Sequence, residues 1–177
     1  MIRFFDLIFS LFGLVFLSPI LILLLIIGYS INRSPIFKQI RVGYLNKPFI
    51  LVKLRSMSKQ TKSAATHLVN TSAITPFGNF LRTTKLDEVP QLWNVLVGDM
   101  SLVGPRPCLF NQKKLINERK KRGVFKVKPG ITGLAQISNI NMKTPLLLAK
   151  TDLKMIKKLN LYYYFYYILK TLKLTLK

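Results

Sequence analysis

The chain has 177 residues, half of them hydrophobic, and its 28 basic residues against six acidic ones give a net charge of +22. A charge of this size points to an anionic partner, either nucleic acid or a membrane surface. The sequence contains no helix-turn-helix, zinc-finger or RNA-reading motif, so we expect no nucleic-acid partner. A lone cysteine, Cys108, excludes an internal disulfide, and a lone histidine, His67, argues against zinc or catalytic-triad chemistry.

An uncharged, strongly apolar segment extends from Leu7 to Asn32. It is longer than the roughly 20 apolar residues that cross a bilayer. Ser18-Pro19 lies near its centre, where the proline should kink or break the helix. Basic residues flank both ends, so the positive-inside rule gives no orientation. A helix–break–helix that enters and leaves on one membrane face explains these features, and a kinked ordinary span is the alternative. We divide the chain into a membrane segment, 1–33, and a body, 34–177.

Two short strands are expected at 36–42 and 49–54, around a turn that contains Asn-Lys-Pro. Lys53 and Arg55 lie two residues apart and so share one face of the second strand. Two cations on one face are typical of a solvated sheet edge, or of a site that contacts phosphate groups.

A polar stretch at 58–72 is expected to form a surface loop. Thr75-Pro76 then predicts a helix start, with Thr75 as the N-cap and proline at the first helical position. Arg82, near the end of this helix, suits either the negative helix terminus or a phosphate contact.

Asp87 and Glu88 bring together two of the six acidic residues. If Asp87 is the N-cap of the next helix, Pro90 falls in the first turn, where its missing N–H is tolerated. An acidic cap alone would explain the pair. The same geometry also suits a nucleophile or a metal ligand beside a phosphate held at the helix N-terminus.

Gly98-Asp99 ends that helix, and Gly104-Pro105-Arg106-Pro107 follows. The two prolines restrict the backbone around Arg106, so its guanidinium loses little freedom on binding. The planar guanidinium can donate two hydrogen bonds to one phosphate. We therefore expect Arg106 and Pro107 at a phosphate site, and an arginine in a tight turn is the alternative.

A helix is expected at 109–122, an extended segment at 131–137, and two further helices that start at 145 and at 161. Asp152, inside the third of these segments, suits a surface ion pair with a nearby lysine. Asn160 should cap the last helix, which has tyrosines at its start and lysines at its end. That distribution is typical of a helix lying in the membrane interface on anionic lipids.

Three ordered blocks of the sequence resemble those of the bacterial sugar transferases, also called monotopic phosphoglycosyl transferases: K-L-R-S-M at 53–57, L-D-E-V-P-Q-L-W-N-V-L-V-G-D-M-S-L-V-G-P-R-P at 86–107 and K-P-G-I-T-G-L-A-Q-I at 128–137. The resemblance implies transfer of a sugar 1-phosphate from a UDP-sugar to polyprenyl (undecaprenyl) phosphate, with release of UMP. It places this first membrane step of glycan assembly at the cytoplasmic face of the bacterial inner membrane. It makes Asp87 the nucleophile of a covalent phosphosugar intermediate, and Glu88, with Asp87, a ligand of Mg²⁺.

The resemblance also implies a fold: a mainly helical α/β protein with a small sheet, monotopic in the membrane, with a re-entrant break at Ser18-Pro19 and interfacial helices. A homo-oligomer is compatible with this picture. The residues expected to contact substrate phosphate are Lys53, Arg55, Arg82, Arg106, Pro107 and Asp152.

One position departs from the family pattern. Ile140 stands where the family has an arginine, so a polar contact expected there is missing. There are two rival functions, and Ile140 favours the first of them. A degenerate relative could act as a membrane scaffold for glycan-assembly partners, or a hydrolase could use an aspartyl-phosphate intermediate without a lipid acceptor. The intact Asp87-Glu88 pair and Arg106 favour the transferase.

Overall fold

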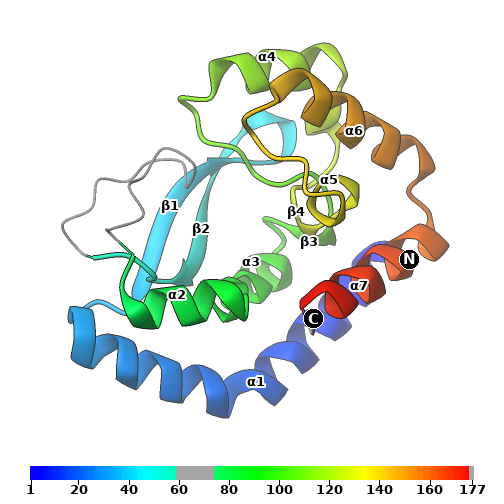
Figure 1. Ribbon diagram of the computed structural model, residues 1–177. Helices are drawn as coiled ribbons and strands as arrows, with labels where there is room; N and C mark the ends of the chain where they lie inside the picture. The colour runs from blue at the N-terminus through cyan, green and yellow to red at the C-terminus, as the bar shows by residue number, and fades with distance from the viewer. Residues whose placement is uncertain (59–73, 176–177) are drawn as a thin grey trace.

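The computed structural model describes residues 1–58 and 74–175 and is mainly helical, as the sequence predicts (Figure 1). The described helices are α1 (Ile2–Asn32), α2 (Pro76–Thr83), α3 (Gln91–Val97), α4 (Lys113–Lys121), α5 (Leu134–Ile137), α6 (Pro145–Lys158) and α7 (Leu161–Thr175). The described strands are β1 (Ile36–Val42), β2 (Pro48–Leu54), β3 (Ser101–Val103) and β4 (Gly130–Thr132). From residue 59 onward, the surface loop expected at 58–72 lies outside the described residues.

Helix α1 remains helical through Pro19, where the sequence predicts a break. Because proline has no N–H, the Val15 carbonyl loses its usual helical partner. The Ser18 hydroxyl donates to that carbonyl oxygen at 2.7 Å. Figure 1 shows that α1 changes direction near the middle of its length. The described backbone is therefore a bent helix rather than two helices.

Both halves of α1 contact the same body of the protein. In the N-terminal half, the Arg3 guanidinium donates to the carbonyl oxygens of Val95 and Leu96 at the end of α3, at 2.5 and 2.9 Å. In the C-terminal half, Leu24 packs into one buried cluster with Leu54 of β2 and Leu81 of α2. The helix thus runs along the body instead of projecting away from it (Figure 1).

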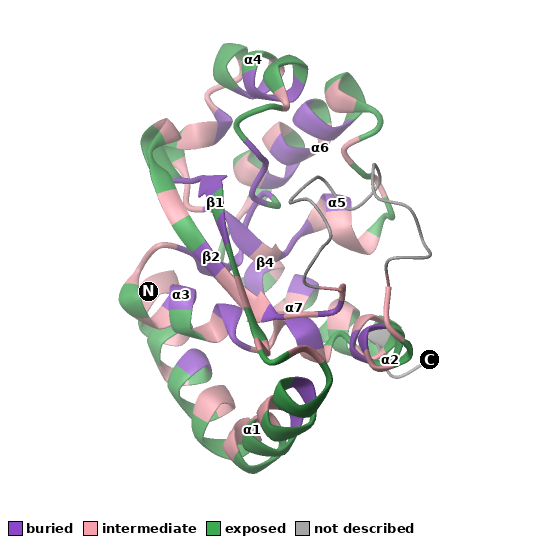
Figure 2. Ribbon diagram, turned by 90° about the vertical axis from the view of Figure 1, so that its left-hand side faces the viewer, coloured by how far each residue is buried: buried purple, intermediate pink, exposed green. Residues whose placement is uncertain are grey.

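The outer face of α1 is exposed (Figure 2), and its exposed side chains are largely apolar. Among the described helices, α1 is the one long and apolar enough to cross a membrane, judged by length and composition. Its most exposed large side chains are Phe4, Phe12, Val15, Phe16 and Ile26. An apolar surface of this extent is expected where a protein meets lipid or a partner.

A buried carboxylate fixes the start of α1. Asp6 is 2% exposed, and its Oδ1 atom accepts hydrogen bonds from the Leu102 amide (2.9 Å), the Ser101 hydroxyl (3.1 Å) and the Tyr164 hydroxyl (2.9 Å). These donors belong to β3 and α7. A buried carboxylate needs several donors to offset its lost hydration, so Asp6 joins three elements at one point.

The predicted hairpin is confirmed: β1 and β2 pair antiparallel, with Ile36 opposite Leu54 and Val42 opposite Pro48. The second sheet pairs β3 with β4 in parallel, with Ser101 opposite Gly130. A Cβ atom on Gly130 would lie 1.9 Å from the Gly104 amide nitrogen, so this approach requires glycine. The segment predicted to be extended at 131–137 is extended only to Thr132 and then forms α5.

Local signals placed three helix starts correctly. The Gly78 amide donates to the Thr75 hydroxyl at 2.9 Å, proline opens α6, and the Tyr163 amide donates to Asn160 Oδ1 at 2.9 Å. The basic helix α4 starts four residues later than predicted, because the Leu109 amide bonds to the Gln112 side chain in a preceding turn. The largest buried cluster lies where α3, β3, α6 and α7 meet, around Val95, Met100, Val103, Met155 and Tyr164.

Candidate active site

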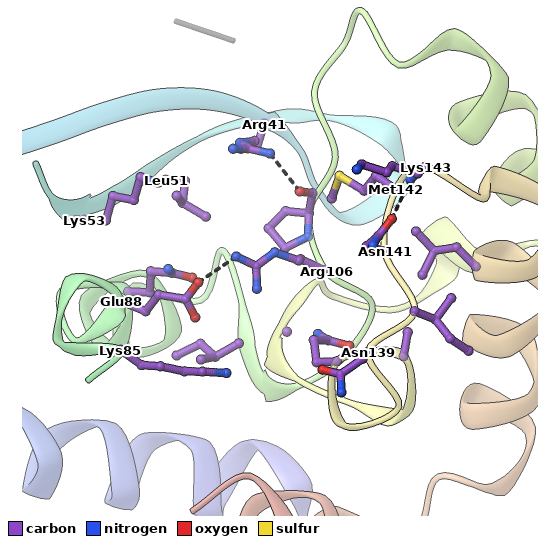
Figure 3. Close-up of a pocket in the computed structure, with 18 residues that line it drawn as sticks. Arg41, Leu51, Lys53, Lys85, Glu88, Arg106, Asn139, Asn141, Met142 and Lys143 are labelled. Carbon is purple, nitrogen blue, oxygen red and sulfur yellow. Dashed lines mark hydrogen bonds and ion pairs between the residues drawn. The ribbon is translucent and has the colours of Figure 1, made fainter. Parts of the chain in front are cut away.

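A pocket of about 560 Å³ opens between the β1–β2 hairpin, the turn before α3, the loop after β3 and the segment between α5 and α6 (Figure 3). Its described lining includes one carboxylate, that of Glu88, and five cationic side chains: Arg41, Lys53, Lys85, Arg106 and Lys143. This concentration of positive charge attracts an anionic ligand such as a phosphate.

The carboxylate pair lies in a 3-10 turn, Leu86–Glu88, and not at a helix cap. Pro90 directly precedes α3, and no side chain caps that helix. The prediction that Asp87 is the N-cap is therefore wrong. Lys85 has a left-handed backbone conformation (φ 57°), and the short turn that follows it contains both carboxylates. Val89 and Pro90 then lead into α3.

The two carboxyl groups differ in environment. Asp87 is 7% exposed, and burial, with repulsion from Glu88, raises its pKa to about 6 although Lys53 and the arginines nearby oppose this shift. Burial alone would raise the pKa of Glu88, but Arg106 holds that pKa below its ordinary value. Glu88 Oε1 lies 2.6 Å from the Arg106 guanidinium. The site therefore holds one firmly ionised carboxylate beside one that titrates near neutrality.

The β1–β2 hairpin supplies two cationic side chains, Lys53 and Arg41, to the lining of the pocket. Lys53, expected there, lines it, and burial lowers its pKa while the Asp87 carboxylate opposes the change. Arg41 also lines it and was not predicted as a site residue. Its guanidinium donates to the Pro107 carbonyl oxygen at 3.1 Å, and burial together with Arg106 lowers its pKa to about 10.

Arg106 and Pro107 line the pocket as expected, whereas three other expected phosphate contacts lie elsewhere. Arg55 donates to the Ser34 carbonyl oxygen at 2.8 Å, and Arg82 donates to the Ser56 hydroxyl at 2.8 Å. Asp152 is buried in an ion pair with Arg119. None of these three described residues lines the pocket, although the charge of Arg82 still acts on Asp87.

The Arg119–Asp152 pair supports the pocket from behind. Arg119 lies 2.8 Å from Asp152 Oδ2, and both side chains are almost fully buried. Arg119 also donates to the backbone carbonyl oxygen of Arg106 at 2.8 Å. The surface ion pair expected for Asp152 is therefore a core ion pair, and it fixes the backbone that carries Arg106.

The wall facing the hairpin is the segment from Asn139 to Lys143 between α5 and α6 (Figure 3). Ile140, in the position of the expected arginine, lines the pocket and packs against the buried cluster that contains Cys108 and Leu148. Lys143 adds a cation to the same wall. This wall therefore carries the side-chain amides of Asn139 and Asn141, and its cation, Lys143, lies three residues after Ile140.

Asp87 and Glu88 are two adjacent carboxylates, which is the chemistry of divalent-cation ligands. Mg²⁺ is usually held by one or two carboxylates, with substrate phosphates and waters completing its shell. Among residues 1–58 and 74–175, no group of three or more His, Cys, Asp or Glu residues gathers to hold a metal. The residues therefore suit a cation shared with a phosphate substrate and not a closed protein site.

A long apolar helix packs on the same body as a cation-lined pocket, and the turn with Asp87 and Glu88 lies at that pocket, with Glu88 in its lining. This arrangement suits an enzyme that handles an anionic substrate at a membrane. The chain belongs to the bacterial sugar transferase family, whose model matches residues 1–177. The resemblance drawn from the three sequence blocks is thereby confirmed.

Several curated relatives are similar over three quarters of the chain or more. An uncharacterized sugar transferase, EpsL, of Bacillus subtilis is 41% identical over 78% of this chain and 69% of its own. The UDP-glucose:undecaprenyl-phosphate glucose-1-phosphate transferase of Klebsiella pneumoniae is 41% identical over 75% of this chain, and the undecaprenyl-phosphate galactose phosphotransferase of Salmonella typhimurium is 36% identical over 78%. The matched regions span only 30% and 33% of these two longer relatives.

Proposed function

We propose that this protein transfers a sugar 1-phosphate from a UDP-sugar to polyprenyl phosphate, releasing UMP. The single observation that carries the proposal is the pocket that Arg106, Lys53 and Arg41 line together with Glu88, with Asp87 next to Glu88 in the same turn. Five cations are enough to bind a diphosphate, and relatives in the family are named for this reaction.

In the first step, a carboxylate oxygen of Asp87 attacks the phosphorus that bears the sugar. A new bond joins that oxygen to phosphorus, and the bond from phosphorus to the bridging oxygen breaks. UMP leaves with the bridging oxygen and its electron pair. Arg106, Lys53 and Arg41 stabilise the charge that develops on the phosphate oxygens.

In the second step, a phosphate oxygen of the polyprenyl phosphate attacks the same phosphorus. The bond from phosphorus to Asp87 breaks, which frees the carboxylate and gives a lipid diphosphate sugar. Glu88 keeps Arg106 aimed at the reacting phosphate through their 2.6 Å contact. Glu88, with Asp87, would hold Mg²⁺, which when bound neutralises phosphate charge.

We further propose that α1 enters and leaves the cytoplasmic leaflet of the bacterial inner membrane on one side. The contacts of Arg3 with α3 and of Leu24 with β2 and α2 support this, because both halves of the helix touch one body. A straight span would carry one end away from that body. The tyrosine- and lysine-rich α7 would lie in the interface, where anionic lipids attract its basic end.

The test is UMP release by detergent-purified protein from a panel of UDP-sugars, with Mg²⁺ and undecaprenyl phosphate. Wild type should release UMP with one sugar preferred, and Asp87→Asn should release none. Asp99→Asn is the matched control, because Asp99 contacts Asn94 at 3.3 Å outside the pocket. No UMP from folded wild type with any donor would favour the scaffold role. UMP without a need for lipid acceptor would favour the hydrolase.

A further inference from the structure

A second pocket, of about 190 Å³, adjoins the first. The two share five lining residues: Lys85, Glu88, Arg106, Ile131 and Gln136. The Glu88–Arg106 ion pair therefore forms a common wall. A group bound in either pocket lies beside the same guanidinium and the same carboxylate.

The remaining lining of the second pocket is largely apolar. It consists of two threonines and four aliphatic side chains from α7, α5, α3 and the turn before it: Thr132, Thr171, Val89, Leu92, Ile137 and Leu174. Charge is thus confined to the end shared with the first pocket. The pocket is amphipathic, cationic at one end and aliphatic at the other.

The apolar end continues toward the membrane-facing surface. Leu92 packs so closely on α1 that a Cβ atom on Gly13 would lie 2.8 Å from its Cδ1 atom. On α7, Leu169, Leu172 and Leu174 are 45 to 65% exposed. The aliphatic lining therefore reaches α1 through Leu92 and the exposed end of α7 through Leu174.

We propose that this pocket binds the acceptor lipid, with the phosphate of a polyprenyl phosphate beside Arg106 and Lys85 and its first isoprene units against Leu92, Ile137 and Leu174. A nucleotide sugar is polar throughout and suits the larger pocket, whereas only an amphipathic anion matches both ends of the smaller one. The inference rests on the proposed function, because it assigns a second substrate to the same reaction centre. The shared wall brings the two substrates to one phosphorus in turn.

The two half-reactions can be tested separately. Without acceptor, the donor half-reaction gives a burst of one UMP per active enzyme; with acceptor, steady-state transfer reports the KM for undecaprenyl phosphate. Leu174→Trp should keep the burst and raise the acceptor KM about tenfold, the discrimination that a hydrophobic pocket gives for small changes in shape. Leu174→Ala should raise it less. The control is Leu172→Trp, on the same helix, because Leu172 lines neither pocket formed by the described residues.

The outcomes separate this inference from the proposed function. A normal acceptor KM for both Leu174 variants, with a full burst, would overturn the inference and leave the transferase intact. An equal KM rise in Leu172→Trp would also overturn it, since α7 would then act through general lipid contact. A wild type without burst or lipid product would overturn the proposed function and this inference with it.

Discussion

Arg119 donates a hydrogen bond of 2.8 Å to the backbone carbonyl oxygen of Arg106 from a position that is itself only 1% exposed. Its charge is balanced by Asp152 in the middle of α6. The side chain of Arg106 lines the pocket, while its backbone carbonyl is hydrogen-bonded to the buried Arg119. A phosphate-binding arginine on a loop is thus held by a buried ion pair on two helices, α4 and α6.

Asp152→Ala should destabilise the protein strongly. The substitution leaves Arg119 buried without its partner, which in other proteins costs about 3 to 5 kcal/mol of folding free energy. Lys154→Ala, an exposed position two residues along α6, should change stability little. Thermal unfolding in detergent measures both. Equal unfolding midpoints for the two variants would contradict the role given to the buried pair.

Arg106→Lys keeps a positive charge but loses the planar, bidentate donor. We expect kcat/KM to fall at least about tenfold, and about 100-fold or more for Arg106→Ala, the size typical of removing a donor to developing charge. Arg55→Lys is the control, since Arg55 binds the Ser34 carbonyl outside the pocket. If Arg55→Lys lost as much activity as Arg106→Lys, Arg55 would have to contact substrate.

The pKa of Asp87, about 6, predicts a pH dependence of rate. The nucleophile must be ionised, so the donor half-reaction should fall as the pH drops through about 6. Rates measured across this range in wild type should show one acid limb. A rate unchanged well below pH 6 would mean that Asp87 is not the titrating nucleophile.

The same shift predicts an opposite trend in stability. Because the folded pKa of Asp87 lies above its ordinary 3.8, the stabilisation that accompanies the neutral form is lost as the pH rises through about 6. Asp87→Asn stays neutral, so wild type should lose thermal stability relative to this variant between about pH 4 and about pH 7. A parallel change in both proteins would contradict the buried, destabilising charge.

The orientation of α1 can be tested by cysteine labelling. Cys108 is fully buried and should react little with a membrane-impermeant maleimide, so single cysteines can be added to the natural chain. Phe4→Cys and Lys38→Cys should label from the same side of the membrane, and Phe16→Cys from neither. All three positions are exposed in the protein without lipid. Labelling of Phe4→Cys and Lys38→Cys from opposite sides would establish a span.

The elements predicted well are those with local signals. The Asn-Lys-Pro turn correctly predicted the β1–β2 hairpin, and Thr75-Pro76 and Asn160 correctly predicted two helix starts. The parallel pairing of β3 with β4 was missed, because its partners are far apart in sequence and depend on the close approach of Gly104 and Gly130. Sequence patterns carry little information about such contacts.

The site was predicted in part. The family motifs predicted Glu88, Arg106 and Lys53, which line the pocket. They also predicted Asp87, which is adjacent to Glu88 in the same turn. Arg41 was missed because the strand inverts the usual pattern of an apolar inner face: Gln39 and Arg41 are buried, whereas Ile40 between them is exposed. The partners of Arg82 and Asp152 depend on tertiary packing that the linear motif does not specify.

The most direct test of the account is the mass of the intact protein after mixing with its UDP-sugar donor in the absence of acceptor. We predict a gain of one phosphosugar per chain, located on the peptide that contains Asp87, absent from Asp87→Asn and discharged by adding undecaprenyl phosphate. Release of UMP without any such adduct, or an adduct that persists in Asp87→Asn, would contradict the assignment of Asp87 as the nucleophile.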